Sequence, residues 1–197
     1  MNCFRLVLLS LLGLLLGWMP LRGQEVRFGA PFDFPLYLSG NFGELRSNHF
    51  HGGLDFKTQG VVGKPLLAIA DGYISKVTVT PGGYGNALYL THDNGYTSVH
   101  GHLDRFLPEI AELVRKKQYA EQAFAVTLEF GPDEFRFRQG EVVAYAGNTG
   151  YSFGPHLHME IRKTATNEPI DPLQFYKDKI TDNIAPRATR IMVYGAP

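Results

Sequence analysis

The 197-residue sequence contains one cysteine, Cys3, so the rest of the chain has no thiol to serve as nucleophile, metal ligand or disulfide partner. It also has no charge excess, because 19 basic residues balance 19 acidic ones. This balance argues against a nucleic-acid partner and against a polybasic membrane surface. Internal repeats and low-complexity stretches are likewise missing. The 44% hydrophobic and 13% aromatic content instead predicts one folded domain with a hydrophobic core.

The only long apolar run lies at the N-terminus, from Leu6 to Met19, and it follows the basic residue Arg5. A run of about 14 residues is short for a membrane span, which needs roughly 20. The run ends at Pro20, and the small residue Gly23 follows. We therefore predict a signal peptide over residues 1–23, with an uncleaved anchor as the alternative. The prediction implies export to the periplasm or cell envelope, with no membrane span after cleavage.

The central part of the chain consists of short β-like runs separated by glycine-rich turns. Two of these runs flank the Asp71-Gly72 turn, which predicts a hairpin, and two are separated by the Asp93-Asn94-Gly95 turn. The four runs cover residues 65–70, 73–79, 87–92 and 96–102.

The region from 106 to 139 has a different pattern. Residues 108–120 begin with Pro108 and repeat apolar side chains at helical spacing, so a short amphipathic helix is expected. Residues 124–138 alternate around a Gly131-Pro132-Asp133 turn and predict an extra hairpin. Further strands are expected at 141–146 and 155–162. The fold class is therefore all-β, an antiparallel sheet or sandwich core with an inserted helix and hairpin.

Four regions are expected along the chain. The signal peptide at 1–23 precedes a loop-rich lead-in segment at 24–48, and the main folded domain covers 49–176. A mixed tail at 177–197 ends with a strand-like run, 188–194. We interpret this tail as the start of a further, truncated region.

All seven histidines lie between positions 49 and 158, and six of them form pairs two residues apart. In a strand, residues two apart project from the same face. A strand from 156 to 161 would thus bring His156 and His158 together. Joined by His51 and Asp55, they could hold a first-row metal, and three such ligands with one open position are typical of catalytic zinc. Spacing alone leaves open which members of the three pairs are the ligands. The pairs are His49 with His51, His100 with His102, and His156 with His158.

Five motifs, in order, resemble the lysostaphin/LytM-type zinc endopeptidases, a family with the duplicated hybrid motif fold that cuts peptide bonds in bacterial peptidoglycan. The resemblance covers roughly residues 39–176. The motifs are the H-x-G-x-D element at 50–56, the hairpin at 68–72, the glycine turn at 83–86, the His-Leu element at 95–103 and the Gly-Pro-His-Leu-His stretch at 147–160.

The resemblance implies a role for each histidine. It assigns His51, Asp55 and His158 as ligands of one Zn²⁺ per chain, and His102 and His156 as catalytic histidines that do not bind the ion. His49, His92 and His100 are then expected to be non-ligands.

The implied function is hydrolysis of stem-peptide crosslinks or cross-bridges in peptidoglycan through attack of a zinc-bound water. The main alternative is a latent or regulatory member of the same family that binds peptidoglycan without cutting it. Less favoured alternatives are a carbohydrate-binding β domain and an amidase. Tyr151 and Phe153 stand where small residues are common in the family, and they are expected to rim the substrate groove. The segment from Phe106 to Gln139 is expected to wall that groove.

Overall fold

The structure is a computed structural model that describes residues 26–180 and Arg187. The predicted signal peptide and the predicted strand at 188–194 lie outside these residues. Over the described part of the chain, no helix has the length and apolar character needed to cross a membrane.

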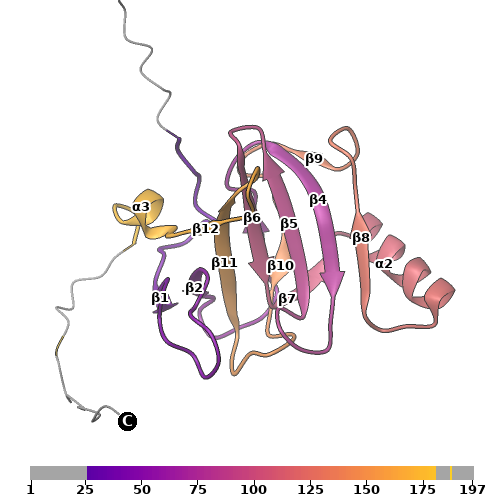
Figure 1. Ribbon diagram of the computed structural model, residues 1–197, viewed down its shortest axis with the longest axis horizontal. Helices are drawn as coiled ribbons and strands as arrows, with labels where there is room; N and C mark the ends of the chain where they lie inside the picture. Colours follow the sequence, from indigo (N-terminus) through magenta and orange to yellow (C-terminus); the bar gives the residue numbers. More distant parts are fainter. Residues whose placement is uncertain (1–25, 181–186, 188–197) are drawn as a thin grey trace, which may run out of the picture.

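A large antiparallel sheet dominates the molecule, with the strand order β1-β2-β11-β6-β5-β4-β8 (Figure 1). Two short strands extend it, since β12 pairs with β11 and β9 pairs with β4. The bounds are β1 (Leu38–Gly40), β2 (Leu54–Lys57), β4 (Gly72–Val79), β5 (Asn86–His92), β6 (Tyr96–Gly101), β8 (Val126–Glu129), β9 (Arg136–Phe137), β11 (His156–Lys163) and β12 (Pro169–Ile170).

A second, three-stranded sheet has the order β3-β10-β7. Its strands are β3 (Lys64–Leu67), β7 (Leu103–Phe106) and β10 (Val142–Ala146). Apolar residues of both sheets form one core, because the alternation of each strand turns its apolar side chains to the same face. Leu66 and Leu103 of the small sheet and Leu157 of β11 are fully buried members of this core.

The two helices lie at opposite edges of the large sheet (Figure 1). Helix α2 (Pro108–Glu121) buries Ile110 and Val114 and packs against β7 and β8. Helix α3 (Leu173–Tyr176) lies beyond β1 and β12 and buries Tyr176, whose hydroxyl donates to the Gly29 carbonyl at 2.7 Å. The described part of the lead-in segment also contributes to the core.

Local sequence patterns were sufficient to predict several of the helices and strands. The antiparallel, strand-rich fold class is confirmed, and the helix predicted at 108–120 is α2. The Asp93-Asn94-Gly95 turn does join a hairpin, β5–β6, and the strand predicted at 155–162 is β11.

The hairpin predicted at Asp71-Gly72 is wrong, because its two arms belong to different sheets. Strand β3 pairs with β10, whereas β4 pairs with β5 in the large sheet. The Asp71 carboxylate accepts the backbone N–H of Gln139 at 2.7 Å rather than closing a hairpin. Gly72 enters the large sheet so closely that a Cβ there would lie 2.3 Å from the Thr91 carbonyl oxygen. The turn thus marks a crossing between sheets.

The extra hairpin predicted at 124–138 is also corrected. Strands β8 and β9 do not pair with each other; both run antiparallel to β4, one after the other. The segment is therefore one edge strand interrupted by a loop, across which Phe130 and Phe135 pack edge to face at 4.7 Å. Pairing along the open edge of the eight-residue strand β4 satisfies the backbone groups of both the segment and β4.

Candidate metal centre

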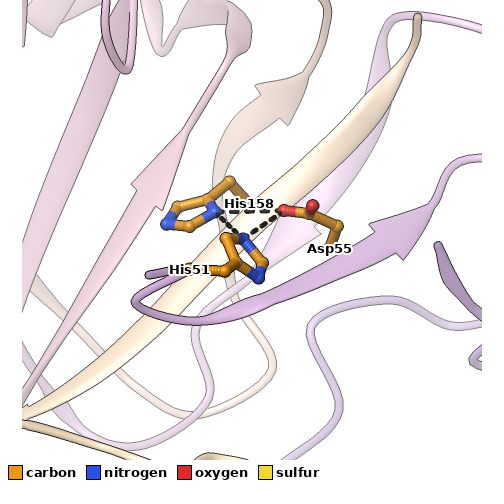
Figure 2. A group of neighbouring side chains, drawn as sticks. All are labelled: His51, Asp55 and His158. Atoms are coloured by element: carbon orange, nitrogen blue, oxygen red, sulfur yellow. Dashed lines mark hydrogen bonds and ion pairs between the residues drawn. The ribbon is translucent and has the colours of Figure 1, made fainter. Parts of the chain in front are cut away.

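The structure brings His158 to His51 and Asp55, although it lies about a hundred residues after them in the sequence (Figure 2). The Asp55 Oδ1 atom lies 3.0 Å from His51 Nε2 and 3.0 Å from His158 Nδ1. The two imidazole nitrogens are 2.9 Å apart. All three residues are buried, with 5–6% of their surface exposed. Three candidate ligand atoms therefore converge on one point. They lie on the face of the large sheet that points away from the core, which is its open face.

Strand pairing explains this convergence. In the β2–β11 register, Asp55 stands directly opposite His158, so their side chains leave the sheet on the same face. His51 lies in the loop just before β2. The neighbouring positions 54 and 157 turn leucine side chains to the core on the other face. Alternation of polar and apolar residues thus both anchors the strands and exposes the ligand atoms.

Two glycines allow the His51 loop to approach β11. A Cβ on Gly53 would lie 2.3 Å from the Met159 carbonyl oxygen, and a Cβ on Gly52 would lie 3.0 Å from a carboxylate oxygen of Glu160. Side chains at these positions would force His51 away from His158. The glycines of the His-Gly-Gly-Leu-Asp motif are therefore required by close packing.

Each of the three residues has a further partner on its other polar atom. The Nδ1–H of His51 donates to the Asn41 carbonyl at 2.7 Å, and the Nε2–H of His158 donates to Glu160 at 3.0 Å. Asp55 Oδ2 accepts a bond from Arg46 at 2.9 Å. Such outer partners fix the orientation of metal ligands. Each residue is consequently held with one atom pointing into the centre.

Electrostatics within the cluster keep Asp55 ionised. Burial raises the pKa of Asp55, but hydrogen bonds from His158 and His51 outweigh burial and hold this pKa well below its usual range. For His158, burial lowers the pKa, whereas bonds to Asp55 and Glu160 raise it, and the net pKa lies above its ordinary value. The cluster is thus an anionic carboxylate between two strongly held imidazoles.

A second pair of histidines, His102 and His156, adjoins the cluster, with ring centroids 4.7 Å apart. The Nε2 atom of His156 is 3.6 Å from Asp55 Oδ1. The Nδ1–H groups are engaged elsewhere: His102 donates to the Thr149 carbonyl and His156 to the Gly154 carbonyl, each at 2.8 Å. This leaves Nε2 as the free nitrogen on both rings. Burial lowers the pKa of His102 to about 4, so this ring is neutral at pH 7.

Two glycine-containing loops position His102. Gly85 and Gly150 pack so tightly that a Cβ on either would lie within 2.5 Å of the other's backbone nitrogen, and both have positive φ angles. This contact brings the Thr149 carbonyl to His102. His102 itself has φ of 60°, a left-handed conformation that is unusual for a residue other than glycine. Its backbone N–H is held by the Tyr84 carbonyl at 2.7 Å.

The other three histidines lie away from the cluster. His49 is exposed and contacts Asn48. His92 and His100 are buried on the core side, where both contact the Ser98 hydroxyl at 2.8 Å. The exposed rings of Tyr151 and Phe153 lie edge to face at 5.5 Å in the loop before His156.

Sequence reasoning named the five clustered residues but missed Arg46 and Glu160. Glu160 had a usable signal, because it lies two residues after His158 in the same strand and must share its face. Arg46 had none, since its position depends on how an irregular loop folds back on β2.

The donor set fits a divalent transition metal. Two imidazole nitrogens and one carboxylate oxygen, all within 4.8 Å of one another, match the ligands of a catalytic zinc site. Among residues 26–180, no fourth His, Cys, Asp or Glu joins this group. One coordination position is therefore left for water or substrate.

Comparison with known proteins identifies relatives of the chain. Residues 49–122 match the model of a protein family described as Peptidase family M23. The chain is 31% identical over 147 residues to the DD-carboxypeptidase/endopeptidase Mpg of Neisseria meningitidis, covering 75% of this chain and 26% of Mpg. It is 30% identical over 124 residues to the peptidoglycan DD-endopeptidase ShyB of Vibrio cholerae, covering 63% of this chain and 22% of ShyB. The chain thus spans about a quarter of the length of these relatives.

A solved structure shares the fold. A zinc-containing peptidase from Vibrio cholerae superimposes with a TM-score of 0.54 at 25% identity, covering 74% of this chain and 39% of that one.

Proposed function

Since this chain belongs to peptidase family M23, we propose that it is a zinc-dependent endopeptidase that hydrolyses peptide crosslinks of bacterial peptidoglycan. The observation that carries the proposal is the buried cluster of His51, Asp55 and His158 with two further histidines beside it. A site that only bound a structural metal would have no use for the additional pair.

We assign His51 Nε2, Asp55 Oδ1 and His158 Nδ1 as the ligand atoms, and Zn²⁺ as the ion. The zinc content of the Vibrio cholerae peptidase with this fold supports that choice. When bound, Zn²⁺ would polarise the scissile carbonyl and lower the pKa of water to about 7.

His102 and His156 carry the proton transfers in this proposal. Their free Nε2 atoms adjoin the cluster, and the lowered pKa of His102 keeps its nitrogen available to accept a proton from water. Once protonated, an imidazolium can donate to the oxyanion of the tetrahedral intermediate or to the leaving amine. The fixed Nδ1–H bonds hold both rings ready, which limits the reorganisation needed during the reaction.

The substrate is the D-alanyl crosslink between stem peptides rather than a glycine bridge. The names of Mpg and ShyB both describe DD-peptidases and support this choice. Such a substrate places the protein in the cell envelope or periplasm, in agreement with the predicted signal peptide. A latent role is not favoured, because Mpg and ShyB are both named as peptidases.

The test is to measure bound zinc in the purified chain and to incubate it with crosslinked peptidoglycan. We expect about one zinc per chain and release of uncrosslinked stem peptides, identified by mass. The Asp55→Ala variant is the matched control and should release none. Zinc without cleavage would contradict the peptidase, and products lacking the sugar–peptide link would indicate an amidase instead.

A further inference from the structure

Glu160 is a buried carboxylate next to the proposed metal centre and is not one of its ligands. It lies in β11 two residues after His158, with 2% of its surface exposed. A charged side chain is buried this completely only when strong partners compensate its loss of hydration.

Both carboxylate oxygens of Glu160 are fully engaged. Oε1 accepts the His158 Nε2–H at 3.0 Å and the hydroxyl of Tyr84. Oε2 accepts the Nε–H of Arg162 at 2.7 Å, and Nη2 of the same guanidinium lies 2.6 Å from Oε2 in an ion pair. A carboxylate held on both oxygens cannot rotate, so Oε1 remains directed at His158.

We propose that Glu160 is a positioning residue that holds the proton of His158 on Nε2 and so presents Nδ1 to the metal ion. A neutral imidazole carries one N–H, and the nitrogen that loses the proton is the one that can bind a metal. The inference rests on the proposed function, because it concerns the ligand set assigned there. A carboxylate partner also makes the ring a stronger ligand.

The surrounding sequence accommodates this carboxylate. Gly52 lies against Oε1, and a Cβ on Gly53 would lie 3.0 Å from Glu160 Cγ. The ring of Tyr84 packs against that of His158 with centroids 5.3 Å apart, so the tyrosine contacts both members of the pair. The loop that supplies His51, the turn that supplies Tyr84 and the strand that supplies His158 therefore meet at Glu160.

The main experiment is the zinc dissociation constant of the Glu160→Gln variant, measured by chelator competition. Glutamine is isosteric but lacks the negative charge, and its amide N–H₂ would face donors already pointing at it. We expect zinc binding to weaken by about 10–100-fold. The matched control is Glu168→Gln, an exposed glutamate paired with Lys163 at 2.9 Å, which should bind zinc as the unmodified chain does.

The outcomes separate the two proposals. If the unmodified chain binds no zinc, the proposed function fails. If the unmodified chain binds zinc and Glu160→Gln binds it equally well, the positioning role is overturned while the proposed function stands.

Two further measurements apply if Glu160→Gln does not fold. Tyr84→Phe keeps the ring but removes one bond to Oε1, and it should weaken zinc binding by roughly 2–10-fold. In the zinc-loaded, unmodified chain, ¹H–¹⁵N spectra of the histidine rings should show a proton on His158 Nε2. A merely structural role for Glu160 would leave zinc affinity unchanged in Tyr84→Phe, and a metal-bound Nε2 would overturn the proposal.

Discussion

Histidines on the two faces of the large sheet have different side-chain partners. On the open face, His158 of β11 contacts Asp55 and Glu160. On the core face, His100 of the neighbouring strand β6 contacts only the Ser98 hydroxyl, and its Nδ1 has no hydrogen-bond partner within the described chain. Both residues are buried, and β6 and β11 are directly paired.

Their partners, rather than their burial, distinguish these two histidines. Burial, with smaller contributions from the nearby His92 and His158, lowers the pKa of His100 to about 3. Burial acts in the same direction on His158, but two carboxylates reverse the outcome and raise its pKa. Two carboxylates bond His158, whereas the Ser98 hydroxyl bonds His100. Counting histidines in the sequence does not reveal this distinction.

The largest effect should come from removing a ligand on the open face. His158→Ala should abolish both zinc binding and peptidoglycan cleavage, because two ligands do not retain a catalytic zinc. His100→Leu, on the core face, should retain both. Metal content and product release would be measured on both variants, and loss of zinc from His100→Leu would show that the faces are not independent.

Removing the neighbouring histidines should affect turnover alone. We expect His102→Ala and His156→Ala to cut kcat by roughly 10²–10⁴-fold, the usual contribution of general acid–base catalysis. Bound zinc should remain at the level of the unmodified chain, since neither residue belongs to the ligand cluster. If His156→Ala loses zinc as readily as His158→Ala, the division between ligands and catalytic histidines is wrong.

The buried histidines should determine how the free energy of unfolding depends on pH. The folded pKa values of His92 and His100, about 4 and about 3, lie below the ordinary value of 6.5. Between pH 6.5 and 4 the unfolded chain therefore binds more protons, and acidification destabilises the fold by about 1.4 kcal/mol per pH unit for each histidine.

His102, whose pKa is also lowered to about 4, contributes with the same sign. His100→Leu should therefore reduce the slope by about a third, the share of one of three such groups. The measurement is the free energy of unfolding in urea at several pH values, with chelator present so that metal binding does not contribute. An unchanged slope would show that His100 takes up its proton without unfolding.

The smallest effect is expected at the rim of the open face. Phe153 is 94% exposed, so Phe153→Ser should change the free energy of unfolding by less than about 0.5 kcal/mol. If the loop contacts substrate, KM for peptidoglycan should rise several-fold with kcat unchanged, as expected for lost uniform binding. Tyr119→Ser is the control, because Tyr119 is 80% exposed on α2, at the opposite edge of the large sheet from β2. An identical KM in both variants would remove Phe153 from the rim.

The sequence predicted best where one short segment determines its own structure. Helix α2 begins at a proline and repeats its apolar residues at helical spacing, and β11 alternates cleanly. The Asp93-Asn94-Gly95 turn joins β5 and β6, which pair with each other as well as with β4 and β11. Residue types and motif order were enough to identify the five clustered residues of the site.

Predictions failed where the structure of a segment depends on partners that are distant in the sequence. The residues around Asp71-Gly72 have the pattern of a hairpin, but β3 pairs with β10 instead of with β4. The arms around Gly131-Pro132-Asp133 likewise pair with β4 instead of each other. Arg46 was missed for the same reason, since its contact with Asp55 spans an irregular loop.

The left-handed backbone of His102 has a consequence for evolution and engineering. Holding a residue with a Cβ in this conformation costs roughly 1–2 kcal/mol, a cost that glycine at the same position would avoid. The backbone conformation alone would therefore favour glycine at this position. A redesign guided only by backbone strain would replace His102, and under the proposed mechanism the product would lose one of its two proton-transfer groups.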